Sequence, residues 1–227
     1  MEFVYTVVGF FSSGGVFMLP IMVVAALGAA IAIERYVTLT RLSRANRSAW
    51  HELQPVLVSG DFEKARELTK AGDTAVARLL AMGLARQGAV RRREDLEIAM
   101  EESMMEIVPQ LEKRTHYLAT FANLATLLGL LGTVSGLIQA FSAVATVNPA
   151  EKANLLSASI SVAMNCTAFG LMTAVPIVLI HAFLSTKTTE LINGLEMASV
   201  KFLNAIGDRQ PTRGQARLGL VQAAAQG

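Results

Sequence analysis

Hydroxyl and amide side chains lie inside two long apolar stretches of the sequence, over residues 115–150 and 153–186. Neither stretch contains Asp, Glu, Lys or Arg. In an apolar environment neutral polar groups can join helices by hydrogen bonds, line a path for water and protons, or coordinate a hard cation. The polar residues that we consider candidates for an ion pathway are Thr133, Thr167, Asn165, Ser161 and Ser159.

These candidates also have structural interpretations. A threonine in a membrane helix often bonds its own backbone one turn back, so geometry alone leaves structural and functional roles equally open for Thr133 and Thr167. The amide of Asn165 needs partners in hydrocarbon, which favours a bond between helices over an ion relay.

The sequence gives no indication of catalysis or of a bound metal. No nucleophile and base are spaced for catalysis, and no phosphate-binding glycine loop precedes a basic residue. Cys166, the single cysteine, lies in an apolar stretch, and the three histidines are too far apart for a short zinc motif. We therefore expect no enzyme activity, no metal and no cofactor. The net charge of +2 is mild and its basic residues are dispersed, which argues against nucleic acid binding.

The composition is that of a membrane protein. Of the 227 residues, 52% are apolar and 17% are charged, and the mean hydropathy is +0.44. A third uncharged stretch covers residues 3–33. A helix of roughly 20 apolar residues crosses about 30 Å of hydrocarbon, so each stretch is long enough to span once. The sequence predicts an all-α membrane protein with transmembrane helices at 16–40, 115–147 and 154–186.

Positive charge predicts the orientation of these helices. Residues 34–114 contain fourteen of the twenty Lys and Arg residues, and five more follow residue 186. By the positive-inside rule, the helical domain 41–114, the helix 187–208 and the tail 209–227 are cytoplasmic, and the segments 1–15 and 148–153 face the other side. We expect the tail to be disordered. Because its positive charge follows the first apolar stretch, we expect that stretch to remain as an anchor rather than to be cleaved as a signal peptide.

Local signals predict the helices outside the membrane. Asp61 is placed to cap one helix, and either Asp73 or Thr74 caps the next, which ends near Gly88. Only Pro109 interrupts the sequence between Glu94 and Val147. We therefore expect one continuous helix there, on the order of 80 Å long and kinked at the proline.

Small residues predict which faces of the second and third spans pack on protein. In the second span they share one side of the helix: Ala122, Ala125, Thr126, Gly129, Gly132, Thr133, Gly136, Ala140 and Ala143. The third span is polar on two opposite faces, one with Ser159, Ala163, Thr167, Gly170 and Ala174, and the other with Ser157, Ser161, Asn165 and Ala168. Three spans cannot bury all these faces, so the sequence predicts a homo-oligomer with a partly hydrated lumen. Pro176 is expected to kink the third span and free a carbonyl.

Two motifs resemble those of a known family. The run from Gly129 to Leu137, Gly-Leu-Leu-Gly-Thr-Val-Ser-Gly-Leu, resembles the second-span signature of the ExbB/TolQ/MotA family. Thr167-Ala-Phe-Gly-Leu171, followed by Ala174-Val-Pro176, resembles its third-span signature. Glu34-Arg35 after the first span and Gly60-Asp61 are similar to further family features, and the likeness is strongest to the ExbB members.

This resemblance implies a subunit of an ion-driven motor in the bacterial inner membrane, with the N-terminus in the periplasm and the C-terminus in the cytoplasm. Five copies would surround the single-span helices of two ExbD- or TolR-like partners. The proton motive force would drive relative rotation and energise a TonB-like protein for outer-membrane transport. Thr133 and Thr167 match threonines that line the lumen, and the partner supplies an aspartate that takes and releases the ion. Alternatives are a TolQ-like envelope-maintenance role with a TolA-like client, a sodium-driven variant, or a passive membrane scaffold.

One position departs from the family pattern. ExbB and TolQ proteins usually carry a glutamate five residues before the third-span threonine, where this chain has Val162. A relay through that carboxylate is therefore not possible here, although MotA-like members also lack it. The neutral oxygens of Ser157, Ser161 and Asn165 suit sodium as well as a water wire. Protons are favoured on the family resemblance alone.

Overall fold

The computed structural model describes residues 15–87 and 93–207, and this part of the chain is helical without β-strands. Its helices are α2 (Met18–Ser59), α3 (Phe62–Ala71), α4 (Ala75–Arg86), α5 (Arg93–Glu112), α6 (Thr115–Thr146) and α7 (Lys152–Gly207). Among the described residues, three segments are long and apolar enough to cross a membrane: α2, the segment Arg93–Thr146 and α7. The predicted all-α class with three candidate spans is confirmed, and the oligomeric state stays a prediction.

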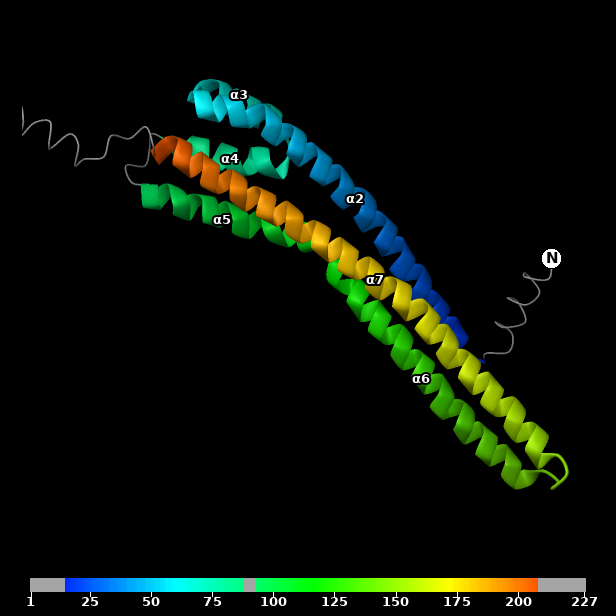
Figure 1. Ribbon diagram of the computed structural model, residues 1–227. Helices are drawn as coiled ribbons and strands as arrows, with labels where there is room; N and C mark the ends of the chain where they lie inside the picture. Colours follow the sequence, from blue (N-terminus) through cyan, green and yellow to red (C-terminus); the bar gives the residue numbers. More distant parts are fainter. Residues whose placement is uncertain (1–14, 88–92, 208–227) are drawn as a thin grey trace, which may run out of the picture. The chain divides into compact units, whose positions relative to one another are not determined.

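The chain divides into two compact units, and α2 and α7 contribute to both (Figure 1). The membrane unit comprises the described residues up to Thr38 together with Glu112–Lys187. The bundle unit comprises Leu39–Leu111 and the described residues from Thr188 onward. Each unit has its own packing.

In the membrane unit, α6 and α7 form an antiparallel hairpin, and the first half of α2 lies beside it (Figure 1). The turn between α6 and α7 includes Pro149, and the amide of Glu151 donates to the carbonyl of Asn148 at 3.0 Å. Gly28 lets α2 approach α7 closely, since a Cβ at this position would lie 2.8 Å from Cδ1 of Ile177. Long apolar stretches of sequence form these helices, and the small residues at their contacts determine how closely the helices pack.

In the bundle unit, side-chain caps begin the short helices as expected. The carboxylate of Asp61 accepts from the backbone of Lys64, and the hydroxyl of Thr74 accepts from the backbone of Ala77. Thr74, rather than Asp73, is therefore the cap of α4. The fully buried side chains that form the core of this unit include Leu79, Leu80, Leu84, Met100, Leu195 and Phe202.

The prediction of one continuous helix from Glu94 to Val147 is wrong at residues 113 and 114. The helix runs through Pro109, but α5 ends at Glu112 and α6 begins at Thr115. Arg114 adopts a left-handed backbone conformation with φ 68°, which is uncommon for a residue other than glycine. Its guanidinium pairs with the carboxylate of Glu34 on α2 at 3.1 Å. The break in the helix therefore coincides with a tertiary contact. No turn signal in the local sequence indicates the break.

The predicted boundary at residue 187 lies inside a helix, since α7 runs without interruption from Lys152 to Gly207 and includes Pro176. The continuation of α2 to Ser59 likewise carries the first span's helix into the bundle unit. Most of the N-terminal segment 1–15, Gly88, and the tail 209–227 lie outside the described residues.

Candidate functional site

The centre of the membrane unit is a contact between α6 and α7 in which backbone meets backbone. A Cβ added at Gly129 would lie 3.3 Å from the Cα atoms of both Thr167 and Gly170. A Cβ added at Gly170 would lie 2.7 Å from the carbonyl oxygen of Ala125. A side chain at either glycine would therefore require the two helices to separate.

The same contact continues along α6 toward its C-terminus. A Cβ at Gly136 would lie 2.8 Å from Cβ of Ala163, and one at Gly132 would overlap Sγ of Cys166. Cys166 is buried and forms no disulfide. We call the contact of Gly129, Gly132 and Gly136 with Ala163, Cys166, Thr167 and Gly170 the glycine seam.

The two candidate threonines make different hydrogen bonds. The hydroxyl of Thr167 donates across the seam to the carbonyl of Gly129 at 2.7 Å. The hydroxyl of Thr133 donates to the carbonyl of Leu130 in its own helix, also at 2.7 Å. Both threonines are half-buried in the chain. Thr167 therefore joins two helices, whereas Thr133 bonds its own backbone one turn back.

The remaining candidate residues lie on α7 with different exposures. Ser159 and Asn165 are half-buried, Ser161 is exposed, and Pro176 is exposed inside the helix. The face with Ala163, Gly170 and Ala174 is buried, as the small-residue pattern predicts, whereas Ser157, Ser161 and Ala168 are exposed. Within residues 15–87 and 93–207, polar hydroxyls of an apolar helix are thus left exposed.

On α6, the small side is buried at Ala122, Ala125, Gly129, Gly132 and Ala140, while Thr126 is exposed and donates to the carbonyl of Ala122. The opposite side is apolar and exposed, as expected of a surface for lipid or a neighbouring subunit. Its exposed side chains are Leu127, Leu130, Leu131, Val134, Leu137, Ile138 and Phe141.

Val162 is half-buried and lies near Gly15, three residues before α2 begins. A Cβ added at Gly15 would lie 3.4 Å from Cγ1 of Val162. An apolar side chain therefore occupies the position at which the resemblance leads one to expect a glutamate.

Sequence reasoning did not identify a cluster of charged and aromatic side chains in the membrane unit. Tyr36 stacks on Phe183 with ring centroids 6.3 Å apart, and Nζ of Lys187 lies 4.9 Å from the Tyr36 centroid. Glu34, Tyr36, Arg114 and Lys187 lie just outside the uncharged stretches, and Phe183 lies near the end of one of them. Aromatic and basic residues at the ends of apolar stretches are the signal that could have indicated this cluster.

The family model of the MotA/TolQ/ExbB proton channel family matches residues 71–197, which is more than half of the chain and includes the glycine seam. The chain belongs to this family. The expected membership of the ExbB/TolQ/MotA family is thereby confirmed. It is a family of channel proteins rather than of enzymes.

Relatives within the MotA/TolQ/ExbB family have moderate identity to this chain. The putative biopolymer transport protein ExbB-like 1 of Synechocystis is 30% identical over 171 residues, which cover 73% of this chain and 65% of that protein. The biopolymer transport protein ExbB of Aquifex aeolicus is 31% identical over 49% of this chain and 72% of its own length. The Tol-Pal system protein TolQ of Haemophilus influenzae is 32% identical over 47% of this chain and 44% of its own.

Proposed function

We propose that this chain is the ion-conducting subunit of an inner-membrane motor that converts the proton motive force into mechanical work. The observation that carries the proposal is the uncovered hydroxyl face of α7, with Ser157 and Ser161 exposed inside an otherwise apolar span. Hydroxyls are poorly placed against lipid, because hydrocarbon offers them no hydrogen-bond partners. A ring of copies would enclose them, and family membership supports a channel rather than an inert contact.

In this proposal five copies surround the helices of an ExbD- or TolR-like partner. The uncharged stretches of the chain contain no carboxylate, so the group that takes and releases the ion must come from that partner. The partner's single span would supply it as a membrane aspartate. The hydroxyls of Thr133 and Thr167, with Ser159, Ser161 and Asn165, would hold the water or ion that reaches this acid.

We propose protons as the ion. Because residue 162 is valine, the chain lacks the carboxylate relay of typical ExbB and TolQ proteins. Proton transfer then runs through water held by neutral side chains. Sodium is the alternative, because the same oxygens suit a hard cation. Activity in sodium-free buffer that is lost on adding a protonophore assigns the ion as the proton.

The client of the motor is proposed to be a TonB-like protein that energises outer-membrane transport. A TolA-like protein with an envelope-maintenance role is the alternative. Relatives named ExbB and TolQ have similar identity to the chain, so identity does not separate the two clients. A TonB-like or TolA-like gene beside the gene for this chain would identify which client is used.

A passive scaffold is the second candidate function, and the Thr167 bond to the Gly129 carbonyl favours it. In that case the hydroxyl serves only to join α6 and α7. The two functions make opposite predictions for bulky substitutions that leave the oligomer intact.

The test places this chain and its gene-adjacent single-span partner in a bacterium that lacks its own ExbB and TolQ proteins, and measures siderophore uptake. Thr133→Leu and Thr167→Leu are expected to abolish uptake, because an apolar side chain interrupts the hydrated path. Native mass spectrometry should still show the pentamer. The matched control is Thr186→Val, since Thr186 bonds its own helix at Ala182 and lies outside the seam.

Full uptake in both threonine variants would contradict a conducting role and favour the scaffold. Loss of the oligomer in Thr167→Leu would assign that residue to packing, and Thr133→Leu would then decide the conducting role alone. A monomeric wild-type protein would contradict the proposal as a whole.

A further inference from the structure

The α5 helix of the bundle unit presents large apolar side chains at its surface. Within the described part of the chain, Ile98 is 62% exposed and Met105 is 75% exposed. They lie seven residues apart and therefore share one face of the helix, on which Pro109 is also exposed. We call Ile98, Met105 and Pro109 the α5 ridge. Apolar residues at this spacing are typical of a helix that docks into a groove of a partner.

Carboxylates lie beside the α5 ridge. Glu94 precedes Ile98 by four residues and Glu102 follows it by four, so both are its neighbours on the helix surface, and both are exposed. These charges favour water over lipid, because an unpaired charge in hydrocarbon is costly. Large apolar side chains that are exposed to water among polar ones are typical of a protein contact. A surface that covers the ridge should be apolar and carry positive charge.

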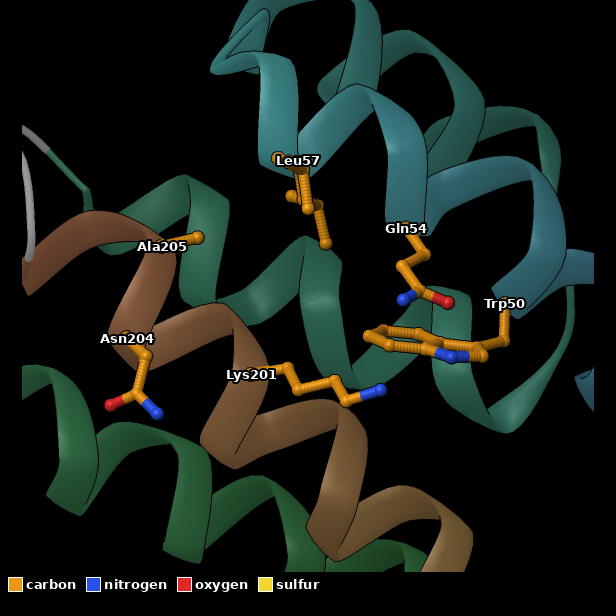
Figure 2. Close-up of a pocket in the computed structure, with 7 residues that line it drawn as sticks. Trp50, Gln54, Leu57, Lys201, Asn204 and Ala205 are labelled. Atoms are coloured by element: carbon orange, nitrogen blue, oxygen red, sulfur yellow. The ribbon is translucent and has the colours of Figure 1, made fainter.

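The bundle unit has a pocket of this chemistry between α2 and α7, which we call the α2–α7 pocket. Its volume is about 420 Å³, and Trp50 and the largely exposed Val58 contribute apolar surface to it. Lys201 is the one charged residue among the described residues that line it, so this lining holds no carboxylate to pair with the lysine. Nζ of Lys201 lies 5.6 Å from the centroid of the Trp50 ring, and Figure 2 shows the lysine side chain extending toward the indole.

The α2–α7 pocket is not filled by α5 of the same chain. Within the bundle unit, α2 and α5 lie on different sides of α7 (Figure 1). The described residues that line the pocket belong to α2 and α7, and none belongs to α5. The chain therefore carries a ridge and a pocket of complementary chemistry at two different places. Contacts between unlike surfaces join copies head to tail, and they close into a ring when the rotation between copies allows it.

We propose that the α5 ridge of one copy docks into the α2–α7 pocket of the next copy. The apolar side chains of the ridge insert beside Trp50, and the carboxylates that flank the ridge pair with Lys201. The inference rests on the proposed function, since it requires the ring of copies proposed there. It adds the surfaces through which the bundle units of that ring meet, and none of these residues belongs to the candidate ion pathway.

Cross-linking between two introduced cysteines tests the contact. In a Cys166→Ala background, Val58→Cys places a thiol at the pocket and Met105→Cys places one on the ridge. Membranes that contain the full-length two-cysteine chain are treated with a short bis-maleimide, and a denaturing gel is expected to show a ladder of products from the dimer upward. Each single-cysteine chain is expected to stay monomeric on the gel, because a contact between unlike surfaces does not bring two identical positions together. A second two-cysteine chain, with Ile98→Cys in place of Met105→Cys, covers a shifted register.

Matched substitutions in the two-cysteine chain test the chemistry of the contact. Ile98→Glu is expected to lower the yield of the ladder roughly fivefold or more, because it adds a charge where an apolar side chain inserts. Its control is Met82→Glu, since Met82 is exposed on α4 and lies outside the ridge and the pocket.

Lys201→Glu is expected to lower the yield by a similar factor, because it opposes the α5 carboxylates. Its control is Lys64→Glu on the exposed surface of α3. Circular dichroism checks that each variant is folded.

Two results separate this inference from the proposed function. Absence of a ladder from both two-cysteine chains, with an intact wild-type oligomer in native mass spectrometry, would overturn the docking and leave the proposed function standing. A monomeric wild-type protein would contradict the proposed function itself.

The remaining outcomes concern what fills the pocket. Dimers from Met105→Cys alone would show α5 against α5, and a ladder unchanged by both Ile98→Glu and Lys201→Glu would contradict the assigned chemistry; either result would overturn the proposal. A photoreactive benzophenone attached at Val58→Cys should capture α5 peptides of another copy, identified by mass spectrometry. Capture of the chain's own residues 208–227, or of a different protein, would overturn the proposal.

Discussion

At Gly170 the two helices of the membrane hairpin approach so closely that a methyl group does not fit. Two glycines facing each other allow this approach, and the Thr167 hydroxyl uses it to reach the carbonyl of Gly129. The candidate pathway and the helix contact therefore share residues. A change at the seam alters both packing and the position of Thr167.

We expect Gly170→Ala to destabilise the hairpin by about 1–3 kcal/mol, the usual cost of overpacking. The new Cβ would lie 2.7 Å from the Ala125 carbonyl and 3.0 Å from Cα of Gly129, and backbone cannot move aside as a flexible side chain can. The free energy of unfolding in detergent, from titration with SDS, is the measurement. Gly194→Ala is the control, since its Cβ meets nothing and alanine favours a helix by about 0.5–1 kcal/mol over glycine. Equal stability of the two variants would contradict the close approach at residue 170.

At the scale of the elements, the two-residue break between α5 and α6 distinguishes this chain from a simple long helix. Pro109 weakens the preceding turns because it cannot donate a backbone hydrogen bond, yet the helix ends only after Glu112. Arg114 adopts the left-handed conformation at the break and pairs with Glu34. The conformation costs roughly 1–2 kcal/mol for a residue with a side chain. An exposed ion pair stabilises the fold by only about 0–1 kcal/mol. The packing of other residues must therefore supply the rest of the free energy that keeps Arg114 in this conformation.

Two substitutions at residue 114 separate conformation from charge. Arg114→Gly and Arg114→Ala both remove the ion pair with Glu34, but only glycine adopts a φ of 68° without strain. We expect the glycine variant to be more stable than the alanine variant by roughly 1 kcal/mol, the cost of the left-handed conformation. SDS titration of both purified variants measures the difference. A higher stability of the Arg114→Ala variant would indicate that residue 114 is helical, and would contradict the break between α5 and α6.

At the scale of the whole molecule, three candidate spans and the unequal distribution of positive charge imply a defined orientation. We expect the turn between α6 and α7 to face the periplasm and the bundle unit to face the cytoplasm.

Labelling of single cysteines tests the orientation. In a Cys166→Ala background, Ala150→Cys places a thiol in the exposed turn, and Glu101→Cys places one on the exposed face of α5. A membrane-impermeant maleimide should label position 150 once the outer membrane is opened, and position 101 only after the inner membrane is permeabilised. The reverse pattern would invert the orientation, and labelling of both positions without permeabilisation would place them on the same side of the membrane.

The sequence by itself determined the class of the protein and much of its local structure. Apolar stretches without charge identify spans because each unpaired charge in hydrocarbon is costly, and Asp61 and Thr74 identify helix starts because their side chains cap the nearest backbone N–H groups. The 3.6-residue period likewise identified the side of α6 that packs on protein, at Gly129 and Gly132.

Only the tertiary structure decided which groups meet across these faces. Periodicity assigns Thr167 to a face, but the rotation and offset of two packed helices decide that its hydroxyl reaches Gly129. The break at Arg114 and the contact of Asn46 with Val76 also depend on partners 80 and 30 residues away in the sequence. Contacts between distant residues come from the packing of whole helices, so no local pattern contains them.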